Sequence, residues 1–341
     1  MRNNQKTARR AQEGGDRLNP QIRKFAVLSD IHGNLPALNA VLEDARSREI
    51  SEFILLGDYC LSNPFPDECM AALMSLKHAH IVRGNEENYL ENLIGKDPRD
   101  WADGQMQVTY WCFRKMAREH LQFLTALPRT LDVRVNSVNI HLSHHSAAWI
   151  GDCEFRLIGP AVLAKRYEGM DRTPEYLRQD IRRLFRQDPA FQDALSALEE
   201  GVYLFGHSHV QWSWQDADRK ILLVNPGSCG LPLDFIHGSV PYSVLSVSEG
   251  GAVSIEEIRV PFDKQGYAEV LQNSEQYAEA TVWTKVITKE WLKAREHMTF
   301  FLDFAEQYAQ QIGDPRRPFA VETWEKAYEI WNGPPESNCL Q

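Results

Sequence analysis

Acidic and imidazole side chains follow short apolar segments at several points of this chain. The first point is Asp30-Ile31-His32, directly after the apolar run Phe25–Leu28. That run is long enough for a buried strand and too short for a globular helix. Because strand side chains alternate between two faces, we expect Asp30 and His32 to point to the same side as the strand leaves its sheet. Placed there together, a carboxylate and an imidazole can bind a divalent metal ion.

Two more short apolar segments end in residues that can bind a metal. Phe53–Leu56 is followed by Gly57-Asp58, and Ile81-Val82 is followed by Arg83-Gly84-Asn85. A helix is predicted between each strand and the next, and this β-α-β-α-β order favours parallel strands. The carboxyl ends of parallel strands line one edge of the sheet, where ligands bind. The acidic, imidazole and amide side chains therefore fall at one edge of the predicted sheet.

Histidines follow two later apolar segments. Val202–Phe205 continues into Gly206-His207-Ser208-His209, and Val138–Leu142 continues into Ser143-His144-His145. Glycine before a ligand would let the backbone turn so that the side chain faces inward. In the second segment His144 competes with His141 and His145 for the role of metal ligand. Together these segments predict a mixed nitrogen and oxygen ligand set, which suits Mn, Fe, Zn, Co or Ni better than Mg or Ca.

The elements that must position these residues can be predicted along most of the chain. We expect one helix over Val108–Leu127, a hairpin before His144, and a mostly helical segment over residues 146–200. Ile221–Val224 and Tyr242–Val247 are expected to complete the sheets. After Phe262 the pattern is helical, with one helix predicted to carry an apolar stripe and a shorter one to follow it. The stripe of the first consists of Trp291, Met298, Phe301, Leu302, Ala305 and Tyr308, and that of the second of Trp324, Tyr328 and Trp331.

Composition restricts the class of protein. The formal net charge of −10 argues against non-specific binding of nucleic acid. The six cysteines are scattered without a C-x-x-C pair, which is typical of reduced thiols in a cytoplasmic protein. No segment approaches the roughly 18 consecutive apolar residues of a membrane span. Residues 1–22 are polar and are expected to form a flexible tail.

The ordered set D-x-H, G-D, G-N, a histidine after a strand, and G-H-x-H resembles the calcineurin-like metallophosphoesterase superfamily. The resemblance extends over about Lys24 to Phe262, and further stretches resemble its bacterial branch. Those stretches are Gly57-Asp58-Tyr59 through Asn63-Pro64-Phe65-Pro66, Leu127-Pro128-Arg129-Thr130, and Asn225-Pro226-Gly227-Ser228-Cys229-Gly230-Leu231-Pro232. Each motif is weak alone, but the ordered set is highly specific.

The resemblance implies a ligand for each position of a site with two divalent transition metal ions, Mn being favoured. Asp58 would bridge the two ions. One ion would also be held by Asp30, His32 and His209, and the other by Asn85, His144 and His207. His144 is favoured over its neighbours because the family's histidine follows the strand by about two residues. Two ions about 3.5–4 Å apart can bind a phosphoryl oxygen while a bridging hydroxide attacks phosphorus.

The sequence departs from the family at Glu86. The family usually has histidine after the G-N motif, where the imidazole protonates the leaving oxygen or stabilises its charge. Here the motif reads Gly84-Asn85-Glu86-Glu87. A carboxylate near two dications would be held ionised and would have no proton to donate. The remaining possibilities are a leaving group stable without protonation, another donor such as His145 or His237, or a site retained only for binding.

The resemblance implies an α/β (α+β) fold, a four-layer α/β/β/α sandwich of two mixed sheets. The domain would span residues 23–262, with 146–200 as a helical insertion near the site. Residues 263–341 would form a helical C-terminal extension that packs on the core or forms a homodimer contact. We expect catalysis to depend on Asp58, Asn85, Glu86 and His145.

The predicted function is dinuclear-metal-dependent hydrolysis of phosphomonoester or phosphodiester bonds in a phosphorylated small molecule or nucleotide. Two alternatives within the enzyme class are a serine/threonine protein phosphatase and a nucleotide or dinucleoside polyphosphate hydrolase. An alternative outside it is a catalytically silent metal-binding module that recruits partners. The substitution at Glu86 favours this last alternative, whereas the complete ligand set disfavours it.

Overall fold

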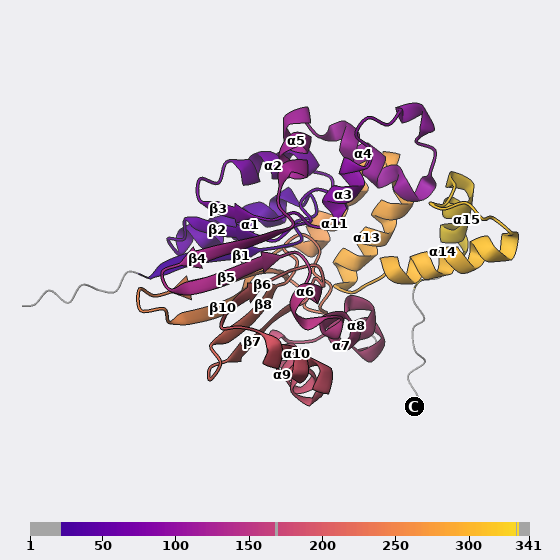
Figure 1. Cartoon of the computed structure of the whole chain (residues 1–341). Helices are drawn as coiled ribbons and strands as arrows, with labels where there is room; N and C mark the ends of the chain where they lie inside the picture. Colours follow the sequence, from indigo (N-terminus) through magenta and orange to yellow (C-terminus); the bar gives the residue numbers. More distant parts are fainter. Residues whose placement is uncertain (1–21, 168–169, 332, 334–341) are drawn as a thin grey trace, which may run out of the picture.

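Two five-stranded mixed sheets form the centre of the protein in the computed structural model, which describes residues 22–167, 170–331 and 333 (Figure 1). Helices cover the outer side of each sheet, so the predicted four-layer α/β/β/α sandwich is confirmed. The predicted tail over residues 1–22 lies outside the described residues except for Ile22.

The first sheet has the strand order β10-β9-β1-β2-β3. Strands β1, β2 and β3 are parallel, as the β-α-β-α-β pattern predicts, whereas β9 is antiparallel to both β1 and β10. The bounds are β1 Arg23–Leu28, β2 Glu52–Leu55, β3 Ala79–Ile81, β9 Ser239–Val247 and β10 Val253–Pro261.

The second sheet has the order β4-β5-β6-β8-β7. Strands β5, β6 and β8 are parallel, and β4 and β7 are antiparallel to their neighbours at the two edges. The bounds are β4 Thr130–Val135, β5 Val138–Ser143, β6 Gly201–Leu204, β7 Gln211–Asp216 and β8 Ile221–Pro226. The hairpin predicted before His144 is the pair β4–β5.

Alternation along the buried strands produces the layers. On β1, Phe25 and Val27 point inward and pack between the sheets with residues such as Ile140 of β5. Ala26 and Leu28 point outward into the core that the helices cover. The strand is therefore apolar on both faces, which is why it appears in the sequence as a continuous apolar run.

Helices on the outer side of the first sheet connect its parallel strands and then lead from β3 to β4 of the second sheet. Helix α1 begins where Asn34 caps it, since the side-chain oxygen of Asn34 accepts a hydrogen bond from the Ala37 N–H at 3.1 Å. The helices on this side are α1 Leu35–Ser47, α2 Pro66–Met74, α3 Glu86–Glu91, α4 Gln107–Lys115 and α5 Arg118–Ala126, with 3₁₀ turns at Pro98–Asp100 and Gly104–Met106. The prediction of one helix over Val108–Leu127 is wrong, because the extended backbone of Met116 and Ala117 separates α4 from α5.

Residues 146–200 are mostly helical, as predicted, and pack on the outer face of the second sheet. Thr173 caps the longest of these helices by accepting a hydrogen bond from the Tyr176 N–H at 3.2 Å. The helices are α6 Ala147–Ile150, α7 Cys153–Ile158, α8 Pro160–Tyr167, α9 Pro174–Gln187 and α10 Pro189–Ala197.

The C-terminal helices pack against the core on the side of the first sheet through Trp291, Phe301 and Trp324. The bounds are α11 Lys264–Gln272, α12 Glu275–Glu279, α13 Thr281–Lys293, α14 Met298–Ile312 and α15 Val321–Ile330. The predicted continuous stripe from Trp291 to Tyr308 is wrong, because the left-handed backbone of Ala294 separates α13 from α14. In the described part of the chain, no helix has the length and apolar character needed to cross a bilayer.

Strands β7 and β10 were not predicted, so the expectation that two segments complete the sheets is wrong. Both lie at sheet edges, and polar residues alternate along both with apolar ones. An edge strand with one exposed face lacks the continuous apolar run on which the prediction relied.

Candidate metal centre

The predicted ligands come together where the central strands of both sheets end. Asp30 and His32 follow β1, Asp58 follows β2, His144 follows β5, and His207 follows β6. Oxygen and nitrogen atoms of these side chains form overlapping groups of three with those of His209, Glu86 and His145, and the ligand atoms of each group lie within 4.8 Å of one another. The convergence expected from the parallel strand order is present.

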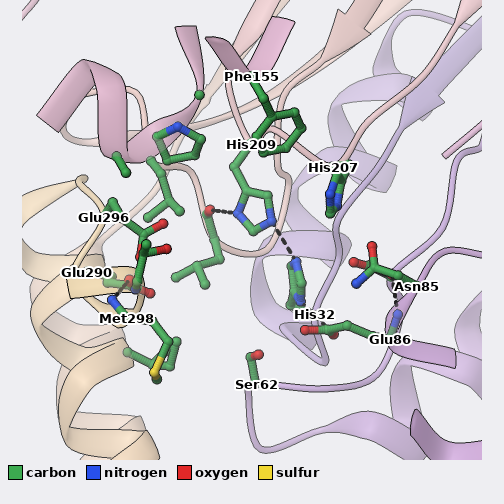
Figure 2. A pocket seen from close by; sticks show the side chains of 18 of the residues that line it. His32, Ser62, Asn85, Glu86, Phe155, His207, His209, Glu290, Glu296 and Met298 are labelled. Atoms are coloured by element: carbon green, nitrogen blue, oxygen red, sulfur yellow. Dashed lines mark hydrogen bonds and ion pairs between the residues drawn. The ribbon is translucent and has the colours of Figure 1, made fainter. Parts of the chain in front are cut away.

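The first group consists of Asp30, His32 and His209. The Nε2 atoms of His32 and His209 lie 3.0 Å apart (Figure 2). The Asp30 Oδ1 atom lies 3.4 Å from the Nε2 of His209 and 3.8 Å from that of His32. Two imidazole nitrogens and a carboxylate oxygen thus point toward one small volume, as ligands of one cation do.

The second group surrounds Asp58. The His144 Nε2 atom lies 3.1 Å from Asp58 Oδ2 and 3.9 Å from Asp30 Oδ1. The ring of His207 lies 5.0 Å from that of His144, and Figure 2 shows Asn85 beside His207 at the same pocket. Asp30 and Asp58 are both in contact range of the same imidazole, so the two groups are continuous.

Left-handed backbone, not strand alternation, brings Asp30 and His32 together. Strand β1 ends at Leu28, and both residues have positive φ values of 53° and 52°. Asp58 has a φ of 55°. His207 and His209 share this conformation, with φ values of 70° and 58°. Because non-glycine residues rarely adopt it and it costs free energy, its repetition at five candidate ligands marks a functional site.

Two of the glycines before ligands are required by close approach. A Cβ atom on Gly84 would collide with the Asp58 carboxylate, and one on Gly206 would collide with the side chains of Ser29 and Asp30. The predicted reason was a sharp turn. The structural reason is that two ligand loops pass each other without space for a side chain.

Hydrogen bonds at the outer ring nitrogens orient the imidazoles. The Nδ1 of His209 lies 2.7 Å from the Leu231 carbonyl oxygen, and the Nδ1 of His144 lies 2.6 Å from that of Leu56. Each Nδ1–H therefore donates to a backbone carbonyl and leaves Nε2 directed toward the carboxylates. This is the tautomer that a metal-binding histidine needs.

One buried polar atom of the site has no partner among the described residues. It is the Oδ1 of Asn85, whereas the Nε2 of His144 faces only the Asp58 carboxylate, 3.1 Å away. Leaving a buried amide oxygen unpaired is costly, so a partner from outside the chain would stabilise it. A divalent cation would bind this oxygen together with the carboxylate and imidazole, and the residues therefore fit a metal.

Charge in the site also favours a cation. Burial raises the pKa of Asp30, but His209, His32 and His144 outweigh it and hold this pKa well below its usual range. Burial lowers the pKa of His144, but Asp58 raises it by more, to about 10. The site thus attracts positive charge, which protons or a divalent cation can supply.

Glu86 has a partner that the sequence did not indicate. Its Oε2 atom lies 2.9 Å from the Nδ1 of His32, and its backbone N–H donates to Asp58 Oδ1 at 2.9 Å. The residue in the place of the family's histidine thus orients one candidate ligand through its side chain and another through its backbone. It also lines the pocket.

Two buried glutamates that support the ligand loops were not predicted. Glu87 accepts hydrogen bonds from the backbone N–H groups of Asp58, Tyr59 and Gly84 at 3.1, 2.8 and 2.7 Å. It fixes the turn that presents Asp58. The only feature of the sequence that could have indicated this role of Glu87 is its position directly after Asn85 and Glu86.

Glu154 reaches the G-H-S-H loop from helix α7. Its Oε1 atom accepts hydrogen bonds from the Ser208 hydroxyl at 2.7 Å, the Trp212 indole at 2.8 Å and the Asn225 amide at 2.8 Å. Ser208 lies between the two histidines of the loop, so this carboxylate connects helix α7 to the metal centre. No local pattern in the sequence pointed to it.

Neither predicted alternative proton donor lines the pocket. His145 lies directly behind the lining, because its ring packs against that of His207 with centroids 4.0 Å apart and forms a possible metal-binding group with His144 and His207. His237 lies 2.9 Å from Asp171 in an ion pair and is also not part of the pocket lining. The role of His145 as a donor stays a prediction.

The pocket beside the metal centre has a volume of about 370 Å³. One wall is formed by Phe155 and residues 159–162 of the α7–α8 segment, and another by α13 and the turn before α14. Figure 2 shows the imidazoles on one side and Glu290, Glu296 and Met298 on the other. Both helical additions therefore help to enclose the space next to the candidate ligands.

Comparison with known proteins identifies the family. The model of the calcineurin-like phosphoesterase superfamily domain matches residues 24–249. An uncharacterized protein of Methanocaldococcus jannaschii is 26% identical over 269 residues, which cover 73% of this chain and 92% of that protein.

The chain is similar to solved structures, and the first named here shares its fold. A metallophosphoesterase from Sphaerobacter thermophilus has a TM-score of 0.53 at 19% identity, covering 80% of this chain and 99% of that one. A hypothetical protein from Pyrococcus horikoshii has a TM-score of 0.49 at 18% identity, covering 77% of this chain and 97% of that one.

Proposed function

The chain belongs to the calcineurin-like phosphoesterase superfamily and is a metal-dependent phosphoesterase, and we propose that it hydrolyses phosphomonoester or phosphodiester bonds with two divalent metal ions. The substrate would be a phosphorylated small molecule. Mn is the favoured metal, because a ligand set of four imidazoles with carboxylate and amide oxygens suits a transition metal better than Mg or Ca.

We assign the ligands as the resemblance implies, with Asp58 shared by both ions. Asp30, His32 and His209 complete one site, and their mutual distances of 3.0–3.8 Å support this assignment. Asn85, His144 and His207 complete the other. When bound, the ions would polarise the phosphoryl oxygens and supply an activated water for attack on phosphorus.

The protein's own groups would hold this arrangement in place. The His207 backbone N–H donates to Asp30 Oδ2 at 3.0 Å, so the loop that carries two ligands also orients a third. Glu86 would keep His32 in its ligating orientation instead of donating a proton. A leaving group stable without protonation fits this arrangement, and His145 is the remaining candidate donor.

The observation that carries the proposal is the convergence of buried carboxylate and imidazole atoms around Asp30 and Asp58, in overlapping groups of three whose ligand atoms lie within 4.8 Å of one another. A protein that had lost metal binding would have no reason to keep these titratable groups buried together at a cost in stability.

Hydrolysis of bis(4-nitrophenyl) phosphate with added Mn²⁺ tests the proposal. We expect turnover by the wild type, loss of turnover with a chelator, and a fall of about 10³-fold in Asp58→Asn. Glu325→Gln, on the exposed face of α15, is the matched control for loss of one acidic charge and should retain full activity. Absence of turnover in the wild type with every transition metal, or undiminished hydrolysis by Asp58→Asn, would refute the proposal.

A further inference from the structure

A pair of carboxyl groups lines the pocket opposite the candidate ligands. Glu290 belongs to α13 and Glu296 to the turn before α14, and their residues are only 1% and 7% exposed. Both line the pocket, and Figure 2 shows them side by side, across from His32 and His209. Buried acidic groups are rare unless they have a partner or a function.

Backbone hydrogen bonds hold this pair in a fixed orientation. The Oε1 atom of Glu290 accepts from the His297 and Met298 N–H groups, both at 2.8 Å. The Oε1 atom of Glu296 accepts from the Thr299 N–H at 2.7 Å. Each carboxyl group therefore has one oxygen engaged in fixing the α13–α14 turn. The turn itself is anchored to the core, because the Phe235 N–H donates to the Ala294 carbonyl oxygen at 2.7 Å.

The two carboxyl groups also lie within hydrogen-bonding reach of each other, which favours a proton shared between them. Burial first, and then the neighbouring Glu296, raise the pKa of Glu290 well above its usual range. Burial likewise raises the pKa of Glu296. With one shared proton the pair carries a single negative charge.

Ser62 provides an independent sign of a ligand in the same pocket. It is 2% exposed and has a φ of 90°, and its backbone carbonyl accepts from the Gln276 amide at 2.9 Å. Its hydroxyl has no hydrogen-bond partner among the described residues, and Figure 2 shows it directed into the pocket. A buried hydroxyl held in this way is available to a bound molecule.

The other residues that line the pocket indicate what the rest of the bound molecule would be. Apolar side chains such as Phe155, Leu233 and Ile287 separate the acidic pair from the metal centre. Of the described residues that line the pocket, none is lysine or arginine. A second phosphate group would therefore find no protein cation here and would face the acidic pair. This disfavours nucleoside polyphosphates and favours a positively charged group on a short apolar chain.

We infer that Glu290 and Glu296 bind the primary ammonium group of an aminoalkyl phosphoester in the pocket that Ser62 also lines. The inference rests on the proposed function, because the metal centre would bind the phosphoryl group at the other end. An ammonium group matches a negative charge on the pair, and its N–H donors suit the carboxyl oxygens. Recognition would take place through the alcohol part of the substrate.

Calorimetry of the Mn²⁺-loaded protein with ω-aminoalkyl phosphonates of two to six carbons tests this inference. Each compound is compared with the alkyl phosphonate of equal length that ends in methyl. We expect the amine at the best chain length to bind about 10- to 100-fold more tightly than its methyl counterpart, which is the value of a charge-assisted hydrogen bond. Equal affinity for both series at every length, or no binding of either, would overturn the inference.

Variants test the residues. In Glu290→Gln the amide keeps the hydrogen bonds and Glu296 keeps the single charge, so most of the amine preference should remain. The double variant Glu290→Gln/Glu296→Gln removes the charge and should abolish the preference. Glu322→Gln/Glu325→Gln removes two exposed charges from α15 and is the matched control, with the preference retained. An amine preference that survives the pocket double variant would show that these residues do not bind the ammonium group.

Hydrolysis of bis(4-nitrophenyl) phosphate is measured on the same preparation. Amine preference without hydrolysis would refute the proposed function and keep the binding site. Hydrolysis without amine preference would do the reverse.

Discussion

Buried carboxyl groups lie on both sides of the pocket, and the pKa values of Asp58 and Glu290 shift in opposite directions, whereas burial raises the pKa of Glu86, beside His32. At the strand ends burial raises the pKa of Asp58, but His144 and His32 together outweigh burial and lower this pKa below its usual value. On the helical wall burial raises the pKa of Glu290, and Glu296 raises it further. Burial is similar on both sides, so the neighbouring side chains decide the direction of the shift.

This difference separates two kinds of acidic site. Carboxylates surrounded by imidazoles stay ionised and present oxygen and nitrogen atoms together, which suits a divalent metal. Carboxyl groups that face each other retain a proton and carry one charge between them, which suits a singly charged organic cation. The pocket between them would therefore bind one molecule by its phosphoryl group and by its amine.

Replacing a strand-end carboxylate should have the largest effect. Asp30→Asn removes the charge that lies within 3.4–3.9 Å of three imidazole nitrogens. We expect hydrolysis of bis(4-nitrophenyl) phosphate to fall by about 10³-fold, with weaker metal binding, while the exposed control Glu325→Gln is unaffected. Steady-state kinetics across a Mn²⁺ titration measure this. A variant that reaches the wild-type rate at saturating Mn²⁺ would show that Asp30 is not a ligand.

Replacing Glu154, a third kind of buried carboxylate, should have the second largest effect. In Glu154→Gln the oxygen that now lacks a partner becomes an amide nitrogen without an acceptor. We expect a loss of about 1–3 kcal/mol in the free energy of unfolding and a 10- to 100-fold loss of metal affinity, because the loop around Ser208 loosens. Urea denaturation and metal titration are the measurements. Unchanged metal affinity at reduced stability would restrict Glu154 to a structural role.

Converting Glu86 to the family's histidine tests the departure at this position. Glu86→His restores an acid worth about 10²–10⁴-fold but removes the hydrogen bond to His32, worth about 10–100-fold. We expect a net gain of about tenfold for alkyl leaving groups and a loss of about 10- to 100-fold for 4-nitrophenolate, which leaves without protonation. Rates with a series of leaving groups of different pKa measure this. An equal change for all leaving groups would exclude a role as a proton donor.

Substitutions on the helical wall of the pocket should have the smallest effect, and that effect should be a change in how stability depends on pH. Because the folded-state pKa of Glu290 is raised, its contribution to stability is fully present below the unfolded pKa of about 4.5 and is lost as pH rises through the folded pKa. Glu290→Gln has no such proton, so its stability relative to the wild type should increase between pH 5 and pH 8. Urea denaturation at both pH values checks this, with Glu325→Gln as control. A constant difference would mean that Glu290 is ionised in the folded protein.

The sequence predicted the parts of the fold that depend on local burial. The strands around Phe25 and Val202 are covered on both faces, so each appears as a continuous apolar run that ends in a ligand. Strands β7 and β10 lie at sheet edges and were missed because polar residues interrupt their apolar pattern. Helix breaks such as the one at Ala294 depend on a left-handed residue that is not a glycine, for which the sequence carries no signal.

The residues of the site could be predicted only where their position follows from the order of the strands. Asp30 and Asp58 were assigned to one edge because parallel strands end there, and the structure brings them together. The left-handed conformations that aim these side chains, and the support from Glu154, depend on tertiary contacts between distant segments. The Glu290–Glu296 pair is formed by packing of the C-terminal helices over the strand ends, which no spacing in the sequence indicates.

The most direct test of the central claim is an anomalous difference map from crystals grown with Mn²⁺. The account predicts two peaks on either side of the Asp58 carboxylate, one contacted by His32 and His209 and the other by His144 and His207. A single peak, or no peak among these side chains, would contradict it.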